Sequence, residues 1–172
     1  MRFGILLLAL GASPLSAQHD HRSPYSGEHN SEIPSLTEEE IRQYRAGEGM
    51  GFARAAELNH FPGPRHVLDL GQEIDLSEDQ RAEIEEIFNR MQAEAIELGG
   101  ELLERETELN MRFRHAHIDE QSLSRMVEEV AVLRGRIRFV HLRAHLETTA
   151  LLSEEQVAAY DRLRGYVEER AR

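Results

Sequence analysis

The chain has 172 residues, a formal net charge of −12 and no cysteine, and arginine supplies every one of its 20 basic side chains. The excess of acidic residues excludes general binding to nucleic acid, which needs a basic surface. The lack of cysteine excludes a disulfide framework, a lipoprotein anchor and a thiol nucleophile. The sequence also contains neither a phosphate-binding glycine loop nor a serine in a nucleophile elbow. We therefore expect that the protein is not an enzyme.

Residues 1–17 have the features of a secretory signal peptide. Met1 and Arg2 give a positively charged start, residues 3–12 are mostly apolar, and Ala17 is a small residue that precedes a polar stretch. The apolar run is too short to cross a bilayer, and no other stretch is apolar enough. We predict an exported protein that is cleaved near Ala17 and has no integral membrane segment in its mature form.

Residues 18–35 are predicted to form a flexible arm, because histidine, proline and glycine occur there without helical or strand periodicity. After cleavage the chain would begin Gln18-His19-Asp20-His21. A terminal amine, a backbone amide and an imidazole form a nitrogen set that suits Cu(II). Two interpretations stay open for His19 and His21: they belong to a disordered polar leader, or they bind copper.

Residues 36–172 are predicted to form a single all-α domain built around a long antiparallel helical hairpin. Apolar residues recur with the helical period in two long stretches, which are separated by a short turn at residues 115–118. Helices of roughly 35 residues are about 50 Å long, and a short turn makes them antiparallel neighbours. The predicted helices are 37–47, 52–59, 65–70, 77–114, a second long helix capped by Asp119, and a closing helix from Ser153.

Three similar phrases mark helix beginnings. Leu76-Ser77-Glu78-Asp79-Gln80 and Leu152-Ser153-Glu154-Glu155-Gln156 are near-copies, and Leu36-Thr37-Glu38-Glu39-Glu40 is a looser third. In each phrase the Ser or Thr hydroxyl can accept a hydrogen bond from the backbone N–H three residues on. The Gln or Glu at that third position can accept one from the N–H of the capping residue. Together the two hydrogen bonds close a capping box.

Three glycines lie near the middle of the predicted hairpin. Gly99 and Gly135 are each eighteen residues from His117 in the turn, so Gly99-Gly100 is expected to face Gly135. A glycine inside a helix costs about 1 kcal/mol relative to alanine. We interpret the three glycines as a site of close helix approach or of a shared bend.

The second long helix is rich in arginine and also has a second apolar face, whereas the first long helix is densely acidic. Attraction between neighbouring helices and solvation of charged faces explain most of this pattern. The other interpretation is a surface, both apolar and cationic, that holds unfolded chains loosely. Because one hairpin partner cannot cover the second apolar face, we also predict a homodimer. The residues predicted to contact unfolded chains are Arg134, Arg136, Arg138, Phe139, Leu142 and Arg143.

His141 and His145 lie one helical turn apart. This spacing places both imidazoles on one face of a helix and suits a divalent transition metal such as copper, zinc, nickel or cobalt. The hairpin register brings Met91 and Glu94 opposite them. A histidine pair on a buried stripe is also consistent with packed, hydrogen-bonded core residues. Both interpretations stay open, and the predicted fold requires no cofactor.

The paired Leu-Ser-x-x-Gln phrases resemble the Leu-Thr-x-x-Gln signature, usually present twice, of the Spy/CpxP family of periplasmic stress proteins. The resemblance extends from about Ser77 to Arg164, with serine in place of the usual threonine. It implies a shallow cradle made by a bent hairpin, and a periplasmic location. It also implies ATP-independent binding of unfolded polypeptides or regulation of an envelope-stress sensor.

A related branch, the periplasmic heavy-metal sensors resembling CnrX, shares the helical hairpin and binds metal through paired His, Glu and Met. In that branch the paired histidines lie in the first helix, whereas His141 and His145 lie near the end of the second long helix. The resemblance therefore implies a chaperone or stress-response protein first. A heavy-metal-binding sensor or resistance protein is the alternative.

Overall fold

The computed structural model describes Ser23, residues 25–27, Ser31 and residues 33–167. The predicted signal peptide and the predicted copper ligands His19 and His21 lie outside the described residues. Residues 31–172 form one compact unit, distinct from residues 1–30, and the description below concerns the described part of that unit.

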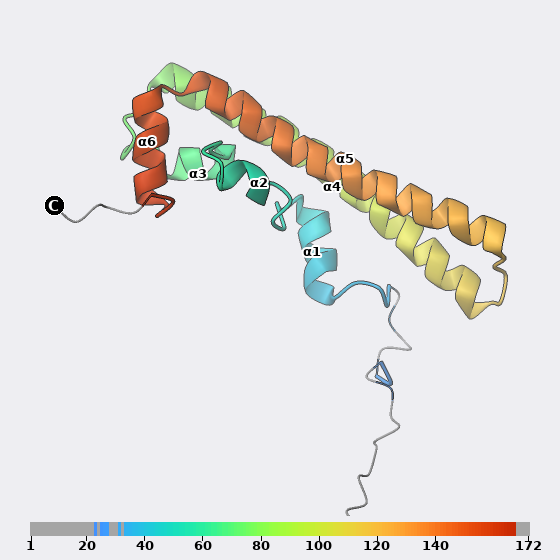
Figure 1. The fold of residues 1–172 in the computed structure, drawn as a ribbon. Coiled ribbons are helices and arrows are strands. Elements are labelled where there is room, and N and C mark those ends of the chain that lie inside the picture. The colour runs from blue at the N-terminus through green and yellow to red at the C-terminus, as the bar shows by residue number, and fades with distance from the viewer. Residues whose placement is uncertain (1–22, 24, 28–30, 32, 168–172) are drawn as a thin grey trace, which may run out of the picture. The chain divides into compact units, whose positions relative to one another are not determined.

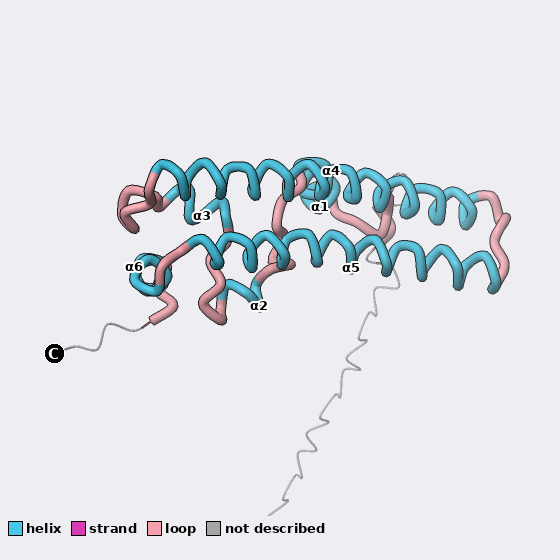
Figure 2. The backbone as a smooth tube through the Cα atoms, turned by 90° about the horizontal axis from the view of Figure 1, so that it is seen from above, coloured by secondary structure: helices cyan, strands magenta, loops and turns pink. Residues whose placement is uncertain are grey.

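The described residues fold into six α-helices and no strands, which confirms the predicted all-α class. The two longest helices pack side by side as an antiparallel hairpin (Figures 1 and 2), as the sequence predicts. Three short helices lie along one side of this hairpin, and a sixth helix closes its open end (Figure 1). The helices are α1 (Glu38–Ala46), α2 (Arg54–Glu57), α3 (Pro64–Asp69), α4 (Glu78–Arg114), α5 (Glu120–Leu151) and α6 (Glu154–Leu163).

All three predicted capping boxes are formed. Thr37 accepts from the N–H of Glu40 at 3.1 Å. Ser77 and Ser153 accept from the N–H groups of their glutamines, three residues on, at 3.2 Å each. Asp119 caps α5 as predicted, and it accepts from the N–H of Ser122 at 2.8 Å. These side chains satisfy N–H groups that have no partner inside the helix, so the helices begin where the sequence places them.

The core lies mainly along the interface between α4 and α5, and α1 covers part of it. A second, smaller core joins α3, the loop before α4, α4 itself and α6 at the open end of the hairpin. The buried residues of this main core include Met91, Ala95, Leu98, Leu102, Ile137, Val140 and Ala144, with Leu36 and Tyr44 from the N-terminal side. The second core contains Val67, Ile74, Ile84 and Tyr160.

Ion pairs between α4 and α5 show the register of the hairpin. Arg143 pairs with Glu94, and Arg90 pairs with Glu147. Glu94 thus pairs with Arg143 rather than lying opposite His141, so the register differs from the predicted one. These side chains are partly exposed, so each pair contributes at most about 1 kcal/mol to the free energy of unfolding.

The predicted meeting of Gly99-Gly100 with Gly135 is wrong. A methyl group at Gly99 would lie 2.4 Å from the carbonyl oxygen of Tyr44, so this glycine admits the backbone of α1. A methyl group at Gly100 or at Gly135 would meet nothing within 4 Å. Symmetry about the turn gave nearly the right level along the hairpin but no information about which helix faces each glycine.

Candidate functional site

A stripe of apolar side chains runs along the outer face of α5. Val132, Phe139 and Leu146 are 61%, 59% and 57% exposed, although each is a large hydrophobic residue. Gly135 and the half-buried Leu142 fall between them with alternating spacings of three and four residues. This spacing places all five residues on one face of a helix, opposite the stripe that packs on α4. We call these five residues the α5 seam.

Arginines flank the α5 seam. Arg143 pairs with Glu94, and its guanidinium also lies 5.5 Å from the centre of the Phe139 ring. Arg136 approaches Glu101 at 4.0 Å. Arg138 is exposed and makes no ion pair with the described residues.

Arg134 faces the N-terminal segment. Burial raises the pKa of the Tyr44 hydroxyl on α1, and the nearby charge of Arg134 opposes that shift. The six predicted client-contact residues therefore divide by role. Phe139, Leu142 and Arg138 face outward on α5, whereas Arg134, Arg136 and Arg143 also contact neighbouring helices.

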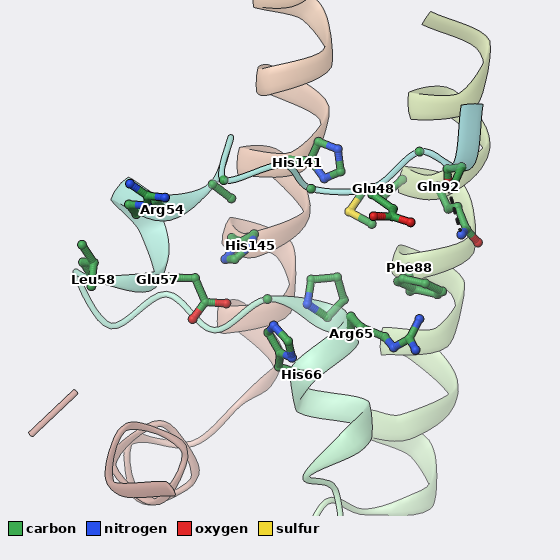
Figure 3. A pocket seen from close by; sticks show the side chains of 18 of the residues that line it. Glu48, Arg54, Glu57, Leu58, Arg65, His66, Phe88, Gln92, His141 and His145 are labelled. Atoms are coloured by element: carbon green, nitrogen blue, oxygen red, sulfur yellow. Dashed lines mark hydrogen bonds between the residues drawn. The ribbon is translucent and has the colours of Figure 1, made fainter. Parts of the chain in front are cut away.

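A cavity of about 580 Å³ lies between the hairpin and the segment that connects α1 to α3 (Figure 3). Four glycines of that segment line it, so the backbone forms much of its wall. Helices α4 and α5 supply the opposite side. The lining includes Gly47, Gly49, Gly51, Ala53, Gly63, Pro64, Phe88 and Met91, and the polar residues Glu48, Arg54, Glu57, Arg65, His66, Gln92, His141 and His145.

His141 is the most deeply buried polar residue of the cavity wall, at 3% exposed. Its ring stacks on Phe52 with centroids 6.1 Å apart, and its Nε2 atom has no hydrogen-bond partner among the described residues. Burial and, to a smaller extent, the neighbouring His145 together lower the pKa of His141 to about 4. The imidazole is therefore neutral at pH 7.

His145 is oriented by the backbone of the α2–α3 connection. Its Nδ1 atom lies 2.8 Å from the carbonyl oxygen of Phe61. A carbonyl only accepts hydrogen bonds, so Nδ1 donates, and Nε2 is the other nitrogen of the ring. A methyl group at Gly63 would lie 2.7 Å from that Nε2 atom and 3.2 Å from Glu57. Glycine is thus the only residue type that fits at position 63, between the imidazole and the carboxylate.

The residues predicted as metal ligands are brought together only in part. Met91, His141 and His145 line the same cavity, whereas Glu94 points to Arg143. Within residues 33–167 and the few others that are described, no group of three or more His, Asp or Glu side chains is arranged to hold a metal ion. The metal site stays a prediction.

Sequence reasoning missed the cavity and the contacts that close it. His60 Nδ1 contacts Asp161 at 2.6 Å, and the Tyr160 hydroxyl donates to Glu57, so α6 holds the α2–α3 connection. The density of glycine over residues 47–51 and the Pro-Gly-Pro sequence at 62–64 were available as signals of close backbone approach. Neither pattern says which helix the loop approaches.

The two Leu-Ser-x-x-Gln phrases, the hairpin and the closing helix define a Spy/CpxP-like protein. Residues 65–164 match the family described as LTXXQ motif family protein, and this match covers more than half of the chain. The chain therefore belongs to the LTXXQ motif family, which confirms the predicted resemblance. The predicted relation to CnrX-like sensors is not shown by this match and stays a prediction.

No curated protein and no solved structure matches the chain. The family is associated with periplasmic proteins. None of the described helices is long and apolar enough to cross a membrane.

Proposed function

We propose that this LTXXQ family protein is a periplasmic, ATP-independent chaperone that holds unfolded polypeptides on the α5 seam. The observation that supports the proposal is the exposure of Val132, Phe139 and Leu146 on one face of α5, each more than half exposed. Soluble proteins rarely leave large apolar side chains aligned in this way without a binding role. Family membership supports the same class of function.

The chemistry of the seam favours weak, general binding. Burying the exposed part of one such side chain contributes about 1 kcal/mol, and ordering a flexible client opposes this gain. A client held by a few such contacts leaves without an energy source. The exposed cation of Arg138 beside the seam attracts acidic segments and acts over a longer range than apolar contact.

The test replaces Phe139 and Leu146 with serine and measures how well the protein suppresses aggregation of a chemically denatured client. Both side chains are largely exposed, so the fold should survive the change. The matched control is Phe113→Ser, because Phe113 is 55% exposed but lies on α4 near the hairpin turn. We expect the double variant to lose most of its protection and the control to keep it. Equal protection by all three proteins would contradict the proposal.

Metal binding is the second candidate function. It is favoured by the position of His141, His145 and Met91 around one cavity, since imidazole and thioether suit late transition metals. A metal sensor would bind stoichiometric Zn(II), Ni(II) or Cu(II) and would show no general protection of clients. Metal content by mass spectrometry, measured beside the aggregation assay, separates the two functions. Regulation of an envelope-stress sensor is compatible with either outcome.

We also propose that the α5 seam pairs with a second copy of the chain when no client is bound. Its spacing of three and four residues is that of a helix that packs against another helix. Gly135 leaves open space in the seam, which allows a second helix to approach closely. A client and a second copy would then compete for the same face.

A further inference from the structure

The cavity between the hairpin and the α1–α3 connection has the size and lining of an organic ligand site. Its volume of about 580 Å³ lies within the range of roughly 300–1,000 Å³ for small-molecule pockets. Such a space far exceeds what a single metal ion fills. Its apolar wall includes Ala53, Pro64, Phe88 and Met91, and an apolar wall favours a ligand with an apolar body.

The buried wall of the cavity contains a polar group without a partner. His141 is 97% buried, and its Nε2 atom makes no hydrogen bond with the described residues. A buried polar group without a partner costs about 1–3 kcal/mol. In most proteins such a group has been paired or replaced by an apolar one. Because this nitrogen is fully enclosed, a ligand cannot reach it, and His141 contributes an uncharged ring to the cavity wall.

The carboxylates of the cavity already have partners. Glu48 forms an ion pair with Arg42 at 2.6 Å. Glu57 accepts from the Tyr160 hydroxyl at 3.0 and 3.1 Å. Glu48 is thus neutralised by a cation, whereas Glu57 has a hydrogen-bond donor but no ion pair among the described residues.

The arginines of the cavity differ from each other. Arg65 pairs with Asp69 at 3.4 Å and lies over the Phe88 ring. Arg54 is exposed at the rim and makes no ion pair or hydrogen bond with the described residues. It is therefore the lining cation with no anionic partner among the described residues. An anionic group at the rim would supply that counter-charge.

We infer that the cavity binds a small amphipathic monocarboxylate, whose apolar chain fills the space against Phe88 and Met91 and whose carboxylate meets Arg54. A medium-chain fatty acid is the simplest molecule with this chemistry. The ligand could arrive as a free acid or be released from a lipid, and the two sources present the same head group. This site is separate from the α5 seam and does not rest on the proposed chaperone function.

Isothermal titration of the purified protein with decanoate tests the inference. Decanol and decyltrimethylammonium carry the same chain with a neutral or a cationic head. We expect saturable binding of one decanoate per chain, about tenfold weaker binding of decanol, and no measurable binding of the cation, since a charge-assisted hydrogen bond is worth about a factor of ten. A single-chain phosphatidylglycerol below its micellar concentration tests whether an intact lipid binds. Its larger head would not reach Arg54 with its chain in the cavity, so we expect it to bind more weakly than decanoate.

Three variants connect the binding to the cavity. Arg54→Gln should weaken decanoate about tenfold and leave decanol unchanged. The matched control, Arg45→Gln, changes an exposed arginine of α1 that does not line the cavity. Gly49→Leu should abolish binding of both ligands, because Gly49 has no positive φ and a side chain there would point at His141, 4.0 Å from the Nδ1 atom.

Two results would overturn the inference. The first is absence of saturable decanoate binding to a protein that is folded by circular dichroism. The second is decanoate binding that Gly49→Leu and Arg54→Gln leave unchanged, since the site would then lie elsewhere, for instance on the α5 seam. Phe139→Ser tests that alternative, because it should weaken decanoate binding if the ligand lies on the α5 seam. Stoichiometric uptake of Zn(II) or Cu(II) that His141→Ala abolishes, without decanoate binding, would make the cavity a metal site instead.

Discussion

Gln80 and Gln156 donate hydrogen bonds to each other's side-chain oxygen, over 2.9 and 3.0 Å. Each side-chain oxygen also accepts from the N–H of its own capping serine, at 3.1 and 2.9 Å. The two copies of the motif are therefore joined, and they connect the first turn of α4 to the first turn of α6. Gln80 further donates to the carbonyl of Leu151 at 2.6 Å, at the end of α5.

This pairing predicts that the two glutamines contribute to stability as one unit. Gln80→Ala and Gln156→Ala should each lower the free energy of unfolding by about 1–2 kcal/mol, because each removes a cap and a buried partner. The double variant should lose clearly less than the sum of the two single losses. Urea unfolding of the four proteins gives the coupling energy. Additive losses would show that the two motifs act separately.

Glu40→Ala is the matched control for that cycle. Glu40 closes the capping box of α1 in the same way, but it has no hydrogen bond to either glutamine. Its loss should therefore add to that of Gln80→Ala within about 0.5 kcal/mol. Coupling between Glu40 and Gln80 would instead indicate a general change in the fold.

The contact between Gly99 and Tyr44 gives a second prediction. Gly99→Ala should destabilise the protein by about 1–3 kcal/mol, since its methyl group would lie 2.4 Å from a backbone oxygen that cannot rotate away. Gly135→Ala meets open space and should stabilise the protein by up to about 1 kcal/mol through helix propensity. The two variants carry the same chemical change, so denaturant unfolding compares the sites directly. A stabilising effect of Gly99→Ala would contradict the close approach of α1.

The caps and the helical period are local properties, and they made most of the fold predictable. Ser77, Asp119 and Ser153 determine where three helices begin through contacts within one turn. The apolar stripes then determine which faces of α4 and α5 meet. The register followed from turn symmetry, but Glu94 was assigned to the wrong partner, because symmetry cannot say how the turn residues divide between the two helices.

The cavity could not be predicted in the same way. It depends on where the segment between α1 and α3 packs, and that packing is set by contacts between residues far apart in sequence. His60 with Asp161 and His145 with the Phe61 carbonyl are examples. The one-turn spacing of His141 and His145 predicted a shared face correctly. It could not predict that the face would be covered by a glycine-rich loop rather than by Glu94.

The α5 seam predicts a dimer that depends on apolar contact. Sedimentation at tens of micromolar should show dimers of the wild-type protein, and Phe139→Ser with Leu146→Ser should shift the population toward monomer, because the seam loses its largest exposed side chains. Addition of salt should weaken the dimer little, since the contact is not ionic. A wild-type protein that stays monomeric at this concentration would contradict self-association through the seam.

The buried imidazole of His141 predicts that acid weakens the fold above the pH at which carboxylates titrate. Its pKa in the folded protein is about 4 because of burial, and in the unfolded chain it is about 6.5. Between these values the unfolded chain binds a proton that the folded protein does not, so the free energy of unfolding falls as the pH falls. From pH 7.5 to pH 5 the loss due to His141 is about 2 kcal/mol. Burial also lowers the pKa of His66, which adds to the effect in the same direction.

His141→Phe tests this assignment. The phenyl ring can keep the stacking on Phe52, and the substitution removes a nitrogen that has no partner in the described part of the chain. Stability at pH 7.5 should therefore change little, while the loss on going to pH 5 should shrink by about 2 kcal/mol. His117→Phe, at the exposed hairpin turn, should leave the pH dependence as it is in the wild type. Urea unfolding at both pH values measures the difference, and a pH dependence that His141→Phe leaves unchanged would show that folding does not shift the pKa of His141.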